Sequence, residues 1–193
     1  VQRGEWDFLW GGKKKQQRCV DYTEYNEGIY VGYRYFQTAG APVSYPFGYG
    51  KSYTTFEYSK PVVKATDKGF TATITVKNTG AVAGKESVQL YVAAPAGGLE
   101  KPAFELKGFA KTKELAPGES QTLTIDVCRY TLASFNEANS AWETAAGTYK
   151  VMFGANAADI RGTGVYKLKK AESWKVNNVL APAQLINELT LQK

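Results

Sequence analysis

The chain has 193 residues, of which 44% are hydrophobic and 22% charged, and its formal net charge is +6. This balance is ordinary for a globular protein and excludes a disordered chain, and the length suits one domain with extensions or two small domains. No run of about 18 or more apolar residues occurs, so we expect no membrane-spanning helix and no membrane partner.

Much of the positive charge lies near the start of the chain. The basic cluster consists of Lys13, Lys14, Lys15 and Arg18. Nucleic-acid binding would need such a cluster interleaved with stacking aromatic side chains across one face. Here the nearby aromatic residues precede a pair of glycines and the basic residues follow it. We therefore interpret the cluster as a solvated loop and predict no nucleic-acid partner.

The two cysteines are Cys19 and Cys128. They lie too far apart in sequence to form a metal-binding spacing. Cys128 ends an apolar strand pattern, which predicts a buried thiol. A disulfide between the two is the alternative, and it would require both side chains to be close in space.

Residues 25–59 are dense in Tyr and Phe, and five glycines and two prolines interrupt them. Aromatic side chains bury large apolar areas, so this stretch must pack against a large surface. The glycines and prolines indicate a backbone that turns repeatedly. Within the stretch, residues 27–36 are compatible with a short helical turn or with an irregular strand. The pattern predicts a structured connector.

From residue 53 onward, apolar residues recur at every second position, which is the period of a half-buried strand. The segments with the clearest alternation are 70–76, 88–92, 123–127 and 149–153. Turn signals separate them, and residues 165–169 carry lysines that suit a final edge strand. Six or seven short strands predict a mostly β, two-sheet sandwich with Ile74, Leu90, Ile125 and Val151 inside.

Three further expectations concern the aromatic side chains and the tail. Residues 130–138 are expected to form one helical turn between strands, and Phe135 and Trp142 to plug the core. Tyr91, Trp142 and Trp174 could stack on sugar rings, but core packing is the favoured role. In the tail, Pro182 could open a short helix, or the tail could pack onto another body.

Two sequence blocks in the aromatic stretch are GIYVGYRYF at 28–36 and PFGYGKSYTTFEYS at 46–59. They resemble the junction of glycoside hydrolase family 3 enzymes (β-glucosidases and relatives), which joins an α/β sandwich domain to a C-terminal fibronectin type III-like domain. Later blocks resemble that domain: VKNTGAVAGKESVQLYV at 76–92, LEKPAFELKGFAKTKELAPGESQTLTI at 99–125 and FNEANSAWETAAGTYKVMFGANAADIR at 135–161. One departure is Tyr49, where many relatives carry His, and both residues suit an aromatic plug.

The resemblance implies a division of the chain into three parts. Residues 1–52 would be the remnant of a preceding α/β domain and an irregular junction, 53–169 the fibronectin type III-like β-sandwich, and 170–193 a C-terminal tail. The chain would then be a fragment of a larger enzyme. Five aromatic side chains are expected to have lost their partners and to form an exposed apolar patch: Trp6, Phe8, Trp10, Tyr30 and Tyr33.

Histidine is absent from the sequence, which excludes Ser-His-Asp, Cys-His and His-ligated metal sites. The segment GYGKS at 48–52 superficially resembles a phosphate loop. A true phosphate loop needs the pattern G-x-x-x-x-G-K-[ST] between a strand and a long helix, and here a β pattern follows. We therefore expect no cofactor and no metal site.

Glycoside hydrolysis needs two carboxyl groups that flank the bond, about 5 Å apart in retaining enzymes and farther apart in inverting ones. Acidic residues near the start are Glu5, Asp7, Asp21, Glu24 and Glu27, but nothing in the sequence places any of them in a pocket. In the resembled family the nucleophile is an Asp on the barrel domain, and the acid/base comes from the α/β domain upstream. Neither motif occurs here, so we assign no catalytic residue and expect the chain alone to be inactive.

The resemblance implies an accessory domain that braces the catalytic domains of an enzyme hydrolysing terminal β-linked sugars. Those domains, and the carbohydrate substrate of the full enzyme, would be its partners. Glu27, Arg34 and Tyr35 fall in the junction block and are candidate interdomain residues. Arg34 lies among aromatic residues and suits a buried ion pair or stacking, with an ordinary surface arginine as the alternative.

The alternative function is a self-standing carbohydrate- or protein-binding β-sandwich, since this fold hosts many binding modules. A free module has no need for a long aromatic connector, which favours the accessory role. The resemblance also favours a periplasmic or secreted location over a cytoplasmic one. The first ten residues lack the apolar core of a signal peptide.

Overall fold

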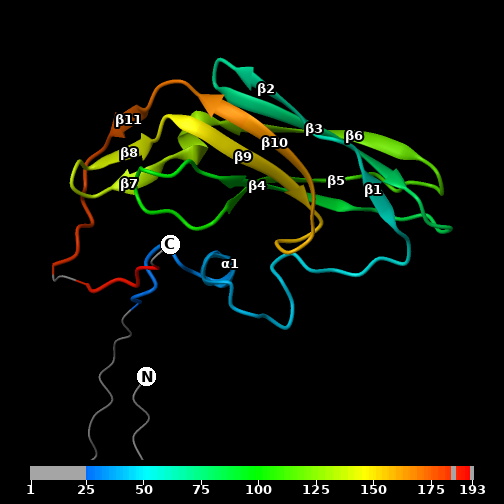
Figure 1. Ribbon diagram of the computed structural model, residues 1–193, viewed down its shortest axis with the longest axis horizontal. Coiled ribbons are helices and arrows are strands. Elements are labelled where there is room, and N and C mark those ends of the chain that lie inside the picture. The colour runs from blue at the N-terminus through cyan, green and yellow to red at the C-terminus, as the bar shows by residue number, and fades with distance from the viewer. Residues whose placement is uncertain (1–24, 184–185, 192–193) are drawn as a thin grey trace, which may run out of the picture.

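The computed structural model describes residues 25–183 and 186–191, and Figure 1 shows their arrangement as a layered β structure. The first sheet contains β1 (Phe56–Tyr58), β2 (Val62–Thr66), β3 (Gly69–Asn78) and β6 (Ser120–Cys128). The second contains β4 (Ser87–Ala93), β5 (Glu105–Lys111), β9 (Gly147–Gly154) and β10 (Ile160–Leu168). A third, small sheet contains β7 (Ser134–Asn136), β8 (Ala141–Thr144) and β11 (Glu172–Lys175).

All the strand pairs are antiparallel. In the first sheet, β3 pairs with β6 along one edge and with both β1 and β2 along the other. The second sheet has the order β10-β9-β4-β5, which places β10 at an edge, as the lysines of 165–169 predict. The helical content of the described residues is α1 (Tyr33–Ala39) and the 3₁₀ turn η1 (Arg129–Leu132). Neither of them is long and apolar enough to cross a membrane.

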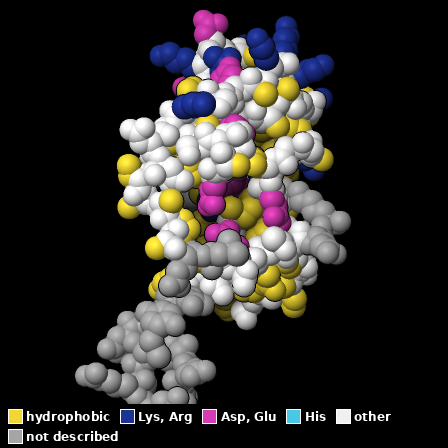
Figure 2. Space-filling view, turned by 90° about the vertical axis from the view of Figure 1, so that its left-hand side faces the viewer, with side chains coloured by type: hydrophobic (Ala, Val, Ile, Leu, Met, Phe, Trp, Pro, Cys, Tyr) yellow, Lys and Arg dark blue, Asp and Glu magenta, His cyan; other side chains and the backbone are white. Residues whose placement is uncertain are grey.

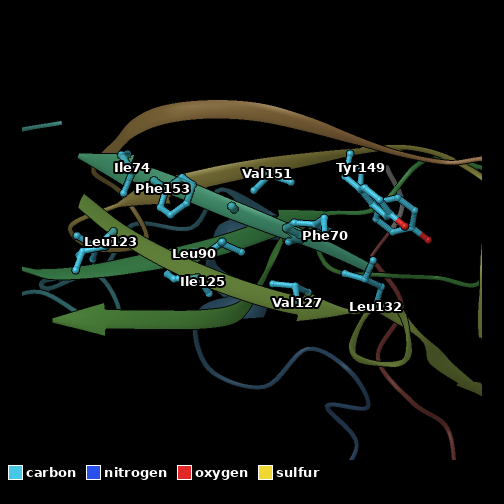
Figure 3. Close-up of a cluster of buried hydrophobic side chains, with 14 of the residues drawn as sticks. Phe70, Ile74, Leu90, Leu123, Ile125, Val127, Leu132, Tyr149, Val151 and Phe153 are labelled. Carbon is cyan, nitrogen blue, oxygen red and sulfur yellow. The ribbon is translucent and has the colours of Figure 1, made fainter. Parts of the chain in front are cut away.

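The main core lies between the first and second sheets, and Figure 3 shows side chains from both sheets meeting there. Ile74, Leu90, Ile125 and Val151 are each at most 7% exposed, which confirms the strand register expected from the sequence. In β3 the apolar residues point inward and the threonines outward, because successive side chains in a strand alternate between faces. The predicted two-sheet sandwich is therefore confirmed.

The alternation fails in β4, where both sets of side chains are buried. Val88, Leu90 and Val92 face the main core, but Gln89 and Tyr91 on the opposite face are also buried. Met152 of β9 lies opposite Tyr91 and is 5% exposed. A strand buried on both faces needs a cover on each side, so something other than the first sheet must lie over the outer face of the second sheet.

Cys128 is exposed, which corrects the prediction of a buried thiol. The inward position at the end of β6 belongs to Val127, so the strand alternation directs Cys128 to solvent. Its Sγ lies 2.8 Å from Oγ1 of Thr131, and this hydrogen bond lowers the pKa of the thiol. Its suggested partner, Cys19, lies outside the described residues.

The expectation for residues 130–138 holds only in part. A single helical turn does form, as η1, but β7 begins directly after it. Phe135 and Trp142 pair across β7 and β8 and are half-buried in the small sheet, so they do not plug the main core. Tyr91 is fully buried, which fits its expected core role, whereas Trp174 pairs with Trp142 from β11 and is also half-buried.

Of the two expectations for the tail, the short helix at Pro182 is wrong, and packing onto another body stays a prediction. Residues 172–175 form β11, and the described residues after it contain no helix at Pro182. The tail instead returns towards the start of the described chain, as the red and blue segments near the label C in Figure 1 show. The backbone N–H of Leu189 donates a 2.7 Å hydrogen bond to the carbonyl oxygen of Asn26.

Candidate interdomain junction

The junction, residues 25–55, first runs beneath the outer face of the second sheet, with α1 below β4 in Figure 1. Its last residues lie beside the first sheet, where Thr54 contacts Asn78 at the end of β3. Glycines at positions 28, 32, 40 and 48 have φ between 55° and 79°, a left-handed conformation that other residues rarely adopt. Gly32 precedes α1 and Gly40 ends it, and the N–H of Ala41 closes the helix by donating to Phe36 O at 3.0 Å. The glycine spacing therefore sets the short helix that the sequence left undecided.

Tyr33 fixes α1 to the second sheet. Its ring stacks on Phe47 with centroids 4.6 Å apart and meets the edge of Tyr91 at 6.1 Å. Its hydroxyl oxygen accepts a 2.8 Å hydrogen bond from the backbone N–H of Leu106 in β5. One side chain thus covers the buried outer face of β4 and satisfies a donor of β5.

Tyr30 makes a second attachment. It is 1% exposed, and its hydroxyl donates a 2.6 Å hydrogen bond to Oε1 of Glu100, 70 residues later in the chain. Burial, together with this carboxylate, raises the pKa of Tyr30 to about 12. The neutral hydroxyl is therefore held as a donor throughout the ordinary pH range.

The segment after α1 returns to the same face of the sheet. The carbonyl oxygen of Phe47 accepts a 2.9 Å hydrogen bond from Ala157 N–H. Nε2 of the buried Gln89 donates to Gly48 O at 3.4 Å and to Ala155 O at 3.1 Å. A Cβ at position 48 would collide with the Gln89 side chain, so the glycine permits this close approach.

These contacts correct the expectation for two of the five aromatic residues. Tyr30 and Tyr33 do not form an exposed patch, because Tyr30 is buried and Tyr33 is half-buried against the second sheet. Together with Phe104 and Leu106, Tyr33 covers a second apolar cluster built from Tyr91, Met152 and Ala157. Trp6, Phe8 and Trp10 lie outside the described residues.

The three predicted interdomain residues are placed differently. Glu27 is exposed, and its carbonyl oxygen accepts a 2.9 Å hydrogen bond from Tyr30 N–H. Arg34 forms an ion pair with Glu105, with Nη2 and Oε1 3.4 Å apart and the arginine side chain 39% exposed, so the pair is present but not buried. Tyr35 is half-buried, with its ring 5.4 Å from that of Phe36. The structure does not bring these residues together as one site.

Many of the side chains that the junction exposes are apolar, and most of these are aromatic. We call them the outer junction surface, and its members are Val31, Phe36, Val43, Tyr45, Phe47, Tyr49 and Tyr53. The rings of Tyr45 and Tyr49 lie 5.0 Å apart, and Tyr53 is fully exposed. Sequence reasoning singled out other aromatic residues, because the density of Tyr and Phe alone does not show which of them face the sheet.

A catalytic pair of carboxyl groups is not found in this surface. Of the five acidic residues considered from the sequence, Glu27 lies in the described part of the chain. The described residues also contain no group of three acidic or cysteine side chains arranged to hold a metal ion. The members of the outer junction surface are aliphatic or aromatic side chains.

The comparisons with known proteins agree with this arrangement. The family described as "Fibronectin type III-like domain" matches residues 86–157. Beta-glucosidase A of Butyrivibrio fibrisolvens is 42% identical over 189 residues, which cover 86% of this chain and 23% of that protein. β-Glucosidase 3B from Thermotoga neapolitana, solved in complex with glucose, matches with a TM-score of 0.76 and 43% identity over 79% of this chain and 21% of its own. The GH3 β-glucosidase of Bifidobacterium adolescentis matches with a TM-score of 0.72 and 35% identity over 80% of this chain and 23% of its own.

The chain contains a fibronectin type III-like domain of the kind that family 3 β-glucosidases carry. This confirms the resemblance to the C-terminal part of a glycoside hydrolase family 3 enzyme. The chain spans about a fifth of the length of the curated relatives that it matches. The match to the fibronectin type III-like domain begins just before β4 and ends after β9, so the junction lies outside it.

Proposed function

We propose that this chain is the accessory C-terminal part of a family 3 glycoside hydrolase and braces its catalytic domains. The full enzyme would hydrolyse terminal β-linked sugars, with β-glucosides as the class suggested by the names of the relatives. The chain itself would contribute no catalytic residue. Its partners would be the catalytic domains of the same enzyme.

The observation that carries the proposal is the outer junction surface. A soluble monomer rarely exposes a large contiguous apolar patch, and such patches usually mark an interface. The cores of protein interfaces are also enriched in aromatic residues. The inward side of the same segment is anchored by Tyr30 and Tyr33, so the outward side is held in a defined position on a folded support.

The requirements of glycoside hydrolysis can be compared with the carboxyl groups of this chain. A general acid needs a raised pKa and access to the substrate. Burial raises the pKa of Glu86, but its Oε1 accepts hydrogen bonds from Tyr58 and Arg161. That carboxyl is committed to holding strands together, which supports an accessory rather than a catalytic role.

The test is to reconstitute the enzyme from two pieces. The catalytic domains of the parent protein, or of a relative such as the Thermotoga enzyme, would be mixed with this chain and followed by analytical ultracentrifugation. We expect a stoichiometric complex that hydrolyses an aryl-β-glucoside faster and melts at a higher temperature than the catalytic piece alone. The 193-residue chain alone should show only background hydrolysis.

A matched pair of variants locates the contact. Replacing Tyr45 and Tyr49 by Ser should weaken the complex by at least tenfold, because both side chains are exposed in the outer junction surface. Val62→Ser removes an exposed apolar side chain from β2, on the outer face of the first sheet, and should have little effect. Turnover by the chain alone would contradict the accessory role, and so would equal weakening by both changes. Failure to form any complex would favour a self-standing binding module.

A further inference from the structure

A groove of about 830 Å³ opens at the end of the molecule that carries the small sheet. One wall comes from η1, β7 and β8, the opposite wall from the start of the junction and the returning tail, and the floor from the first residues of β5. Figure 2 looks onto this end and shows acidic side chains around a hollow with an apolar interior. The volume is in the range of small-molecule binding sites.

The first wall is aromatic. Tyr130, Phe135 and Trp142 all line the groove, and Trp142 lies 5.8 Å from the ring of Tyr130 and 5.6 Å from that of Phe135. Trp174 supports Tyr130 at 5.4 Å. Tyr130 is 47% exposed and the other two groove-lining rings are half-buried, so they form a continuous wall that remains accessible to a ligand. Phe135 and Trp142 are the side chains that we expected, from the sequence, to plug the main core.

The other lining groups are polar and include both donors and acceptors. Glu105 on the floor pairs with Arg34 at 3.4 Å and with Lys107 at 3.1 Å. Glu100 accepts the hydroxyl of Tyr30. Glu137, at the mouth, is exposed. A ligand here would meet carboxylate acceptors beside ammonium and guanidinium donors.

The charge of the lining restricts the ligand class. Four glutamates, at 100, 105, 137 and 188, outnumber Arg34 and Lys107, which disfavours phosphate groups and nucleic acid. Within the described residues the acidic side chains form no cluster able to hold a metal ion. A neutral ligand that offers hydroxyl groups at its edge and apolar C–H faces for stacking fits the remaining features.

We infer that this groove binds a saccharide, with its ring faces against the aromatic wall and its hydroxyl groups on the charged floor. The inference goes beyond the accessory role and does not depend on it, because it needs only residues of this chain. Failure to bind the catalytic domains and failure to bind a saccharide are therefore separate outcomes.

The test uses the full 193-residue chain labelled with ¹⁵N and titrated with cellotetraose, laminaritetraose, xylotetraose or mannotetraose. At least one sugar should bind saturably in the millimolar range or tighter, with chemical-shift changes centred on residues 130–137 and 142. Phe135→Ala should weaken binding at least tenfold. Glu137→Gln, which changes an exposed groove side chain and should leave the fold intact, should weaken it severalfold.

Phe109→Ala is the control, because it removes an exposed aromatic ring outside the groove and should leave binding unchanged. No saturable shift with any of the four sugars would overturn the inference. So would binding that Phe135→Ala and Glu137→Gln leave unaltered. A groove that responds instead to a lysine-rich peptide would be a peptide site, and the saccharide assignment would be wrong.

Discussion

The guanidinium carbon of Arg161 lies 5.0 Å from the centroid of the Tyr58 ring, so a residue of β10 in the second sheet covers a residue of β1 in the first. The same guanidinium contacts Glu86 at 3.3 Å and Asp159 at 2.6 Å, and the Tyr58 hydroxyl donates to Glu86 at 2.9 Å. This cluster joins the edges of the two sheets where no backbone ladder connects them.

Arg161→Ala should lower the free energy of unfolding by about 2 to 4 kcal/mol, because it leaves the half-buried Glu86 carboxylate without its cation. Arg161→Lys should fall between that variant and the wild type, since an ammonium group keeps the charge but not the planar contact with Tyr58. Urea unfolding measures both. A loss below about 0.5 kcal/mol for the alanine variant would show that the cluster is only a surface feature.

Lys101 gives a stability change with a defined pH window. Its ammonium is buried and donates to Leu132 O at 2.8 Å, and burial lowers its pKa from 10.5 to about 8. Between these pH values the unfolded chain holds a proton that the folded chain has lost, so this group makes folding more favourable as pH rises. Lys101→Met lacks the effect. The free energy of unfolding of the wild type, relative to that variant, should therefore rise by on the order of 1 to 3 kcal/mol as the pH rises from about 8 to 10.5. A difference that stays constant over this range would contradict the lowered pKa of Lys101.

Ile74→Asp should destabilise the sandwich by several kcal/mol, because it places an unpaired charge between the two sheets at a position that is 1% exposed. Ile74→Val, which removes one methyl group, should cost about 1 kcal/mol. Thr73→Asp places the same charge on the outer face of β3 and serves as the control, with a much smaller expected loss. Thermal unfolding of the three variants decides whether the register is right.

Tyr33→Phe should cost about 1 to 2 kcal/mol, since the N–H of Leu106 then has no acceptor from the junction. Tyr45→Phe removes an equivalent hydroxyl from a side chain that is 71% exposed, and should change stability by less than about 0.5 kcal/mol. Denaturant unfolding compares the two. Equal effects would mean that the junction contributes no specific hydrogen bond to the fold.

Two truncations test the proposed division near residue 53. Removing residues 1–24 should change the melting temperature little, because Tyr30 and Tyr33, which attach the junction to the sandwich, remain in the shortened chain. Removing residues 1–52 should lower it by roughly 10 °C or more, because Tyr91 and Met152 lose their cover. If the two truncated chains melt at the same temperature, the sandwich is independent of the junction.

The sequence by itself determined the strands that line the main core with alternating side chains. The period-two pattern of β3, β6 and β9 depends only on which face of each strand is buried, and that is a local property. It also indicated that residues 25–59 must pack against a large surface, because so many aromatic side chains cannot remain in water together.

The tertiary structure decided which surface that is. Whether the outer face of a strand such as β4 is buried depends on what lies over it. Here the junction, some 50 residues earlier in the chain, covers Gln89 and Tyr91. The same holds for Tyr30, whose hydroxyl donates to Glu100, and for Trp142, which lines the groove together with other side chains of the small sheet. Such placements depend on contacts between residues far apart in the chain, and a local pattern of residue types does not encode them.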